Sequence, residues 1–274
     1  MESIAFAIIS VTVIGILCGV LLTFISTVMA VKEDERFPAV RACLPGANCG
    51  ACGYAGCDGY ARALLGGDVK TNLCVPGADS TAKKLSELLG VACEDVTEQV
   101  SFVRCSGDCN ATSAKVDYRG IQSCAAAKLL FGGSGKCSFG CLGFGDCMNA
   151  CPYGAIRVED GLARVVSRLC VGCGLCVPAC PNHLLATLPD TVAVYVGCSS
   201  TDKGALTRKA CTNGCIACRK CEKECPVGAI RVEDNLARID YALCAGCGRC
   251  AEVCVTGCIS VGDFSGASHT AQIG

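Results

Sequence analysis

The spacing of the cysteines constrains this chain more than any other feature of its sequence. The run from Cys215 to Pro226 reads C-x-x-C-x-x-C-x-x-x-C-P. This is a ligand pattern for paired [4Fe–4S] clusters, in which three cysteines of a tight loop hold one cluster and the fourth ligates another. A partner run of four cysteines follows. The pattern therefore predicts two ligand sets, Cys215, Cys218, Cys221 and Cys254, and Cys225, Cys244, Cys247 and Cys250.

Zinc is the alternative metal, because paired C-x-x-C knuckles can also supply it with four thiolates. Two interlocked runs with a Cys-Pro pair favour clusters over zinc. The 274 residues include 29 cysteines, an odd number, and no small-residue cleavage site follows the first apolar segment. Both observations argue against a secreted disulfide scaffold. The formal net charge is −1, so the chain lacks the excess of basic residues that is typical of nucleic-acid-binding proteins.

An uncharged apolar segment runs from Ser3 to Val31. At about 1.5 Å per residue it is long enough to cross the roughly 30 Å of bilayer hydrocarbon. We expect residues 1–31 to form one transmembrane anchor in the cell membrane, rather than a buried helix of a soluble domain. Clusters are loaded in a reducing compartment, so everything after Lys32 should be cytoplasmic. Cys18 lies inside the segment and is not a ligand candidate.

Residues 32–95 contain a second cysteine pattern, rich in glycine. Glycine lets backbone N–H groups turn toward sulfur. A helix from about Tyr60 to Leu65 is expected here, followed by an amphipathic helix with Ser80 or Thr81 as its N-cap and Gly90 as its end. Cys43 falls outside the spacing. One further [4Fe–4S] site is predicted at Cys49, Cys52, Cys57 and Cys74.

From Cys124 onward the chain repeats itself. The stretch that begins Cys-Pro-Tyr-Gly-Ala-Ile-Arg-Val-Glu-Asp at Cys151 recurs, nearly unchanged, at Cys225, an offset of 74 residues. A duplication explains this and predicts two tandem ferredoxin-like modules, at 136–186 and at 187–274, with 96–135 as a connecting segment. In each copy a Glu-Asp-Gly or Glu-Asp-Asn sequence predicts a tight β-hairpin. The expected fold class is α+β.

The first module lacks the standard spacing, because Phe144 stands where the second module has Cys218. Its two predicted sets are therefore Cys137, Cys141, Cys147 and Cys180, and Cys151, Cys170, Cys173 and Cys176. The repeat relates Cys137 to Cys211, so the second module offers both Cys211 and Cys218. We expect Cys218 to be the ligand, because it restores the standard spacing.

Five sites are thus predicted, and three further cysteines suggest a sixth. Cys105, Cys109 and Cys124 lie between the cluster modules, and Cys198 is the fourth cysteine that best completes them. The alternative is a structural group of cysteines without metal. Cys93 and Cys258 receive no role.

Motifs for other cofactors are missing. The sequence has no complete G-x-G-x-x-G after a strand and no complete P-loop, so we expect no NAD, flavin or ATP site in this chain. His183 and His269 are the only histidines, too few for a proton relay. We expect no independent catalytic site.

The chain combines three features in a fixed order. One apolar helix comes first, then a glycine-rich domain with Cys49, Cys52, Cys57 and Cys74, and then the ferredoxin-like modules. The order resembles the B-subunit family of Rnf ion-translocating ferredoxin:NAD oxidoreductases. The resemblance implies a translocase subunit that takes electrons from soluble ferredoxin and relays them to integral membrane subunits and to flavin- and NAD-carrying subunits. The alternative is a polyferredoxin subunit of a membrane hydrogenase or of a heterodisulfide-type enzyme.

Overall fold

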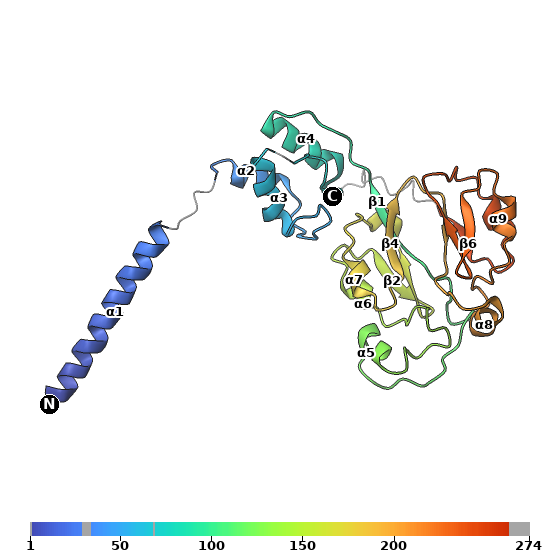
Figure 1. Cartoon of the computed structure of the whole chain (residues 1–274), viewed down its shortest axis with the longest axis horizontal. Helices are drawn as coiled ribbons and strands as arrows, with labels where there is room; N and C mark the ends of the chain where they lie inside the picture. Colours follow the sequence, from blue (N-terminus) through green and yellow to red (C-terminus); the bar gives the residue numbers. More distant parts are fainter. Residues whose placement is uncertain (1, 29–33, 68, 263–274) are drawn as a thin grey trace. The chain divides into compact units, whose positions relative to one another are not determined.

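The computed structural model describes residues 2–28, 34–67 and 69–262. The chain divides into two compact units, one ending at Ala39 and one beginning at Val40. Helix α1 (Glu2–Val28) lies in the first unit (Figure 1). Within the described residues it is the one helix long and apolar enough to cross a membrane, from Ile8 to Thr27. Residues 29–31 of the predicted anchor, and His269, lie outside the described part of the chain.

Three helices and a 3₁₀ turn form the small domain after the anchor. They are α2 (Phe37–Cys43), α3 (Gly56–Leu65), η1 (Val75–Gly77) and α4 (Ala78–Leu89). α3 buries Cys57, Tyr60, Ala61 and Leu64, which recur at the spacing of one helix face. α4 ends at Gly90, whose φ of 67° is left-handed, as predicted.

The N-cap predicted for α4 was wrong. The helix begins earlier, at Ala78, with Gly77 as N-cap and no side-chain cap. The 3₁₀ turn η1 runs directly into the helix, so Ser80 and Thr81 fall inside its first turns. Ser80 instead donates its hydroxyl to the carbonyl of Gly77 at 3.0 Å.

Each ferredoxin-like module consists of two small antiparallel sheets joined by short helices. In the first, β1 (Gln99–Val103) pairs with β4 (Leu185–Pro189), and β2 (Ile156–Glu159) pairs with β3 (Leu162–Val165). In the second, β5 (Val194–Val196) pairs with β8 (Ile259–Val261), and β6 (Ile230–Glu233) pairs with β7 (Leu236–Ile239). The remaining elements are α5 (Cys124–Leu129), α6 (Asp146–Asn149), η2 (Ser167–Leu169), α7 (Cys176–Ala179), α8 (Gly204–Ala210), α9 (Lys220–Glu224) and α10 (Arg249–Glu252).

Both predicted hairpins are present. Asp160 and Gly161 have φ values of 51° and 73°, and Asp234 and Asn235 have 50° and 62°. Two consecutive left-handed residues are typical of the type I′ turn, whose twist matches that of the paired strands. The helices and short strands confirm the expected α+β fold.

Strand β1 comes from the segment that we expected to be a connection. Arg104, the residue after β1, donates its backbone N–H to the carbonyl of Leu184 at 2.7 Å. Gly197, the residue after β5, donates in the same way to Cys258 at 2.7 Å. The two strands therefore have equivalent places in their modules, and the next residues, Cys105 and Cys198, are equivalent as well.

Candidate iron–sulfur centres

The first cysteine site, here called site 1, comprises Cys49, Cys52, Cys57 and Cys74. Burial raises the pKa of Cys74 to about 11, and its proximity to Cys57, Cys49 and Cys52 raises it further, against a lowering hydrogen bond from Gly77. The loop before α3 is held by Asn48, whose side-chain oxygen accepts the backbone N–H of Cys57 at 2.9 Å. The four cysteines predicted for this site are therefore near enough for Cys49, Cys52 and Cys57 to affect the pKa of Cys74.

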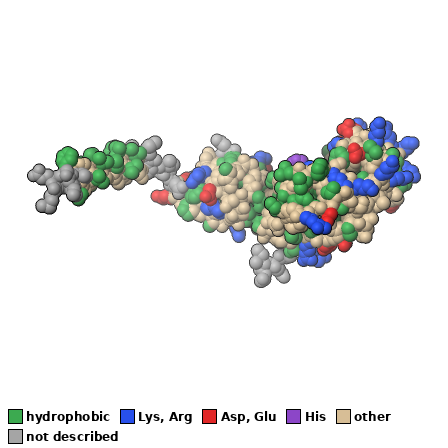
Figure 2. Space-filling view, turned by 90° about the horizontal axis from the view of Figure 1, so that it is seen from below, with side chains coloured by type: hydrophobic (Ala, Val, Ile, Leu, Met, Phe, Trp, Pro, Cys, Tyr) green, Lys and Arg blue, Asp and Glu red, His purple; other side chains and the backbone are tan. Residues whose placement is uncertain are grey.

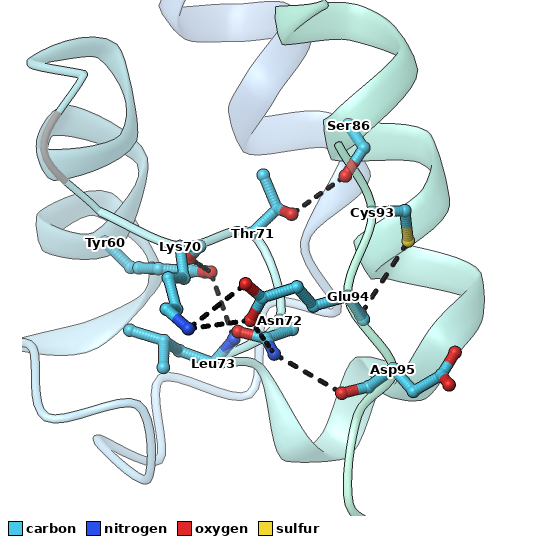
Figure 3. Close-up of polar contacts among 9 residues, drawn as sticks. All are labelled: Tyr60, Lys70, Thr71, Asn72, Leu73, Ser86, Cys93, Glu94 and Asp95. Atoms are coloured by element: carbon cyan, nitrogen blue, oxygen red, sulfur yellow. Dashed lines mark hydrogen bonds and ion pairs between the residues drawn. The ribbon is translucent and has the colours of Figure 1, made fainter. Parts of the chain in front are cut away.

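Polar contacts hold the segment that leads to Cys74 (Figure 3). The Tyr60 hydroxyl donates to the carbonyl of Lys70 at 2.7 Å and accepts the N–H of Leu73 at 3.3 Å. Lys70 forms an ion pair with Glu94 at 2.8 Å. Cys93, close to this network, contacts the carbonyl of Glu94 at 3.8 Å. Buried Tyr60 therefore connects α3 to the ligand-bearing segment.

Site 2 lies in the first module, around one apolar cavity whose cysteines are Cys124, Cys141, Cys147 and Cys180. This differs from the predicted set, which had Cys137 in place of Cys124. The sequence pattern placed Cys124 in the possible sixth set instead, because it lies far upstream of the cluster loop. One feature of the sequence did indicate that a cysteine from elsewhere is needed. The cluster loop of the first module lacks its middle cysteine, because Phe144 occupies that position.

The N-terminus of helix α5 positions Cys124. The carboxylate of Asp146 accepts the backbone N–H groups of Cys124 and Ala125 and the hydroxyl of Ser123, each at 2.9 Å. Burial raises the pKa of Asp146, but these three hydrogen bonds outweigh it and leave the pKa below its ordinary value. An anionic acceptor at a helix N-terminus satisfies N–H groups that have no partner within the helix.

A separate cavity lies between the two modules and encloses about 290 Å³ of atom-free space, part of it open to solvent. Two of its cysteines belong to each module: Cys105 and Cys137 to the first, and Cys198 and Cys211 to the second. A Cβ placed on Gly107 would lie 3.0 Å from the Sγ atom of Cys211 and 3.7 Å from that of Cys105. We call this group the inter-module site.

The inter-module site differs from the predicted sixth set in two members. Cys124 belongs to the cavity of site 2. Cys109 is exposed, and its backbone N–H bonds to the carbonyl of Asp160 at 2.9 Å. The ungapped repeat paired Cys198 with Cys124, whereas the fold gives Cys198 and Cys105 equivalent places. Cys137 and Cys211, which the repeat does relate, complete the site.

Site 3 is the set predicted at Cys151, Cys170, Cys173 and Cys176. Burial raises the pKa of Cys176, and the proximity of Cys170 and Cys151 raises it further. Burial also raises the pKa of Cys173, against a lowering hydrogen bond from the backbone of Leu175, and the proximity of Cys49, Cys170 and Cys176 raises it further. Ser101 of β1 donates its backbone N–H to the sulfur of Cys170 at 3.3 Å, so this strand supports site 3.

The second module contains two further cavities. Cys225, Cys244, Cys247 and Cys250 line one, here called site 5. Cys215, Cys218, Cys221 and Cys254 line the other, site 4, together with a fifth cysteine, Cys258. Cys218 therefore lines the cavity of site 4, and Cys211 lines the inter-module cavity.

Backbone N–H groups point at cysteine sulfurs in both modules. Ala155 donates to the Sγ atom of Cys151 at 3.4 Å, and its repeat partner Ala229 donates to Cys225 at 3.3 Å. Burial raises the pKa of Cys225, but N–H groups of the following turn outweigh it and lower the pKa overall. Amide donors of this kind stabilise a thiolate, which is the state that ligates metal.

The donor sets suit a cluster better than a single ion. Within the described residues, no group of three or more His, Cys, Asp or Glu side chains is close enough together to hold one metal ion. A cube of four irons carries its cysteines on separate corners and therefore spaces them more widely than one zinc ion does. Four sulfurs around an apolar cavity, with amide donors to some of them, fit such a cube.

Family models match most of the cysteine-bearing chain. Residues 44–76 match the family described as "Putative Fe-S cluster". Residues 134–181, 169–230 and 214–258 match three families that are each described as "4Fe-4S dicluster domain". These matches show multiple [4Fe–4S] centres in the two modules and an iron–sulfur domain after the anchor.

Characterised relatives align over nearly the whole chain. The B subunit of the Na(+)-translocating ferredoxin:NAD(+) oxidoreductase complex of Acetobacterium woodii is 41% identical over 85% of this chain and 70% of its own length. The B subunit of the proton-translocating ferredoxin:NAD(+) oxidoreductase complex of Clostridium ljungdahlii is 40% identical over 89% and 87%. The B subunit of the ion-translocating oxidoreductase complex of Methanosarcina acetivorans is 40% identical over 84% and 88%.

Proposed function

Because the chain belongs to the B-subunit family of Rnf ion-translocating ferredoxin:NAD oxidoreductase complexes, it is an iron–sulfur electron carrier of a membrane complex, and we propose that it relays electrons from reduced ferredoxin toward membrane partners through six [4Fe–4S] clusters. This family membership confirms the resemblance inferred from the order of the cysteine motifs.

The observation that carries the proposal is the inter-module site. Sites 2 and 3 belong to the first module and sites 4 and 5 to the second. Cys105 and Cys137 face Cys198 and Cys211 across the junction. A cluster held there would be ligated equally by both modules and would connect their electron carriers. Each cluster, when bound, accepts and releases one electron.

The protein's own residues supply ligation and environment rather than proton transfer. Six sets of four thiols hold the clusters, apolar side chains such as Leu142, Leu184 and Ile230 exclude water, and backbone N–H groups donate to sulfur. Burial and hydrogen bonding of this kind set cluster potentials. No side chain of this chain is assigned to acid–base catalysis.

The partners and the orientation follow from the same reasoning. Helix α1 anchors the chain in the membrane, and the cysteine domains lie on the cytoplasmic side, where clusters are assembled. Reduced ferredoxin is the electron donor. NAD binds to another subunit, since this chain has no complete dinucleotide motif, and flavin-carrying and integral membrane subunits receive the electrons.

The test mixes the purified, cluster-loaded full chain with a substoichiometric amount of reduced ferredoxin. Reduction of the clusters is monitored by the loss of their visible absorbance and by low-temperature electron paramagnetic resonance. The proposal predicts that ferredoxin reduces the chain, and that ferredoxin-dependent NAD reduction appears only when the other Rnf subunits are added. A chain that ferredoxin leaves oxidised, while dithionite reduces it, would show that the donor enters elsewhere in the complex.

A further inference from the structure

An excursion of the first module, residues 113–136, forms a closed lobe around helix α5, here called the α5 lobe. Its neck is held by two backbone hydrogen bonds, from Lys115 to the carbonyl of Ser134 and from Lys136 to the carbonyl of Ser113, each of 2.8 Å. Tyr118 packs edge to face on Phe144, with ring centroids 5.4 Å apart. These contacts close the neck of the lobe and join it to the loop that carries Phe144.

The tip of the lobe is apolar and almost fully exposed. Leu129, Phe131 and Ile121 are 86%, 84% and 75% exposed. Phe131 has a left-handed φ of 52°, and its carbonyl accepts the ammonium group of Lys115 at 2.8 Å. Phe131 thus sits at a turn that presents its ring to solvent, and exposed apolar groups that are held in place mark an interaction surface.

The charged side chains of the lobe are mostly basic. The lobe carries four, Lys115, Arg119, Lys128 and Lys136, against one acidic residue, Asp117, which pairs with Arg119 at 2.8 Å. Figure 1 shows α5 at the lower edge of the module, and Figure 2, seen from below, shows hydrophobic and basic side chains beside one another on that face. Apolar tips with basic flanks suit the boundary between lipid headgroups and acyl chains.

The duplication indicates that the apolar tip is not a requirement of the fold. Cys211 follows Cys198 by 13 positions, whereas Cys137 follows Cys105 by 32, so the second module replaces the α5 lobe by a much shorter segment. The second module forms its own two sheets and cavities with this shorter segment. The exposed side chains of Leu129 and Phe131 therefore contribute little to the packing of their own module, which leaves them free to contact a surface outside the chain.

We propose that the α5 lobe inserts its apolar tip into the surface of a bilayer that contains anionic lipid. The apolar helix α1 belongs to the same chain, so the lobe is tethered to a membrane and meets its surface at high effective concentration. Basic flanks supply attraction to anionic headgroups, and Leu129, Phe131 and Ile121 enter the interface. A second contact of this kind would restrain the cluster domains against the membrane that holds their electron acceptors.

The sequence allows a direct test, because it contains no tryptophan. Phe131→Trp in the full chain places a single fluorophore at the tip. Its fluorescence emission is measured in vesicles of phosphatidylcholine and phosphatidylglycerol, once with brominated and once with ordinary acyl chains. The clusters quench the emission equally in both, so the ratio of the two emissions reports quenching by the brominated lipid alone. Ala205→Trp, at an exposed position of helix α8 in the second module, is the control, and iron content checks that both variants are loaded.

The proposal predicts quenching by brominated lipid at Phe131→Trp, no quenching at Ala205→Trp, and weaker quenching when phosphatidylglycerol is omitted or Lys128→Glu is added. Equal emission in both lipids at Phe131→Trp would overturn it. A blue shift that appears only after the other subunits are added would also overturn it, and would assign the tip to a protein interface.

Discussion

The Sγ atom of Cys258 lies 3.6 Å from the Sγ atom of Cys254, beside a cavity that four other cysteines already surround. Cys258 is 2% exposed and also hydrogen-bonds to Cys215. That bond lowers the pKa of Cys215 to about 6 and raises the pKa of Cys258. When iron binds Cys215 and Cys254, neither keeps a proton, so the single S–H of Cys258 is the donor, to one of the two sulfurs or shared between them.

Replacing Cys258 should therefore lower the midpoint potential of the cluster in site 4. Hydrogen bonds to ligand sulfur favour the reduced, more negative cluster, and Cys258→Leu removes this donor. Leucine is the matched choice, because the repeat places buried Leu184 at the same position of the first module. Redox titration followed by electron paramagnetic resonance measures the shift.

The control is Cys93→Ala, which changes an exposed cysteine outside every proposed site. It should leave all potentials in place. Loss of four irons in Cys258→Leu, rather than a shifted potential, would mean that Cys258 is itself a ligand.

Tyr60→Phe should loosen the segment that carries Cys74. The hydroxyl bridges the carbonyl of Lys70 and the N–H of Leu73, and removing one partner of a buried hydrogen bond costs about 1–3 kcal/mol. Faster hydrogen exchange at the Leu73 amide and a lower unfolding midpoint are expected. Tyr54→Phe removes a hydroxyl from the ring that stacks on Tyr60 at 5.5 Å; an equal effect there would contradict the specific role of Tyr60.

Asp146→Ala should destabilise the start of α5 and release iron from site 2 first. Loss of a helix N-terminal acceptor costs about 0.5–2 kcal/mol. Because the pKa of Asp146 is lowered in the folded chain, its contribution is complete above the unfolded value of about 3.9 and disappears as pH falls through the folded value. Amide protection of Cys124 and Ala125 should therefore fall in the variant and stay unchanged in the native chain from pH 8 to pH 6.

Local sequence predicted those parts of the fold whose determinants lie close together. The hairpin at Asp160 and Gly161 needs only its turn residues. The cysteines that line site 5 come from the Cys-Pro turn and from one short loop. The inter-module site could not be derived in this way, because strand pairing brings Cys105 to a place that an ungapped repeat gives to Cys124. Spacing identifies the kind of ligand, whereas the fold decides which ligands meet.

Deleting Met1 to Val31 should leave a chain that still binds clusters and accepts electrons from ferredoxin. Every proposed ligand lies in the compact unit that begins at Val40. Ferredoxin-dependent NAD reduction by the complex should fail, because the relay is no longer held against its membrane acceptor. If the truncated chain fails to load iron, the helix has a role in cluster assembly. If the truncated chain supports full NAD reduction, the helix is not needed to hold the protein against its membrane acceptor.

If both modules share a sixth cluster, the iron and acid-labile sulfide content of each chain will show it. Six cubes give about 24 iron atoms in the native chain and five give about 20. Cys105→Ala should lose about four irons, whereas Cys109→Ala, which changes an exposed cysteine four residues along, should lose none. A native chain saturated at about 20 irons, or equal iron in both variants, would contradict the account.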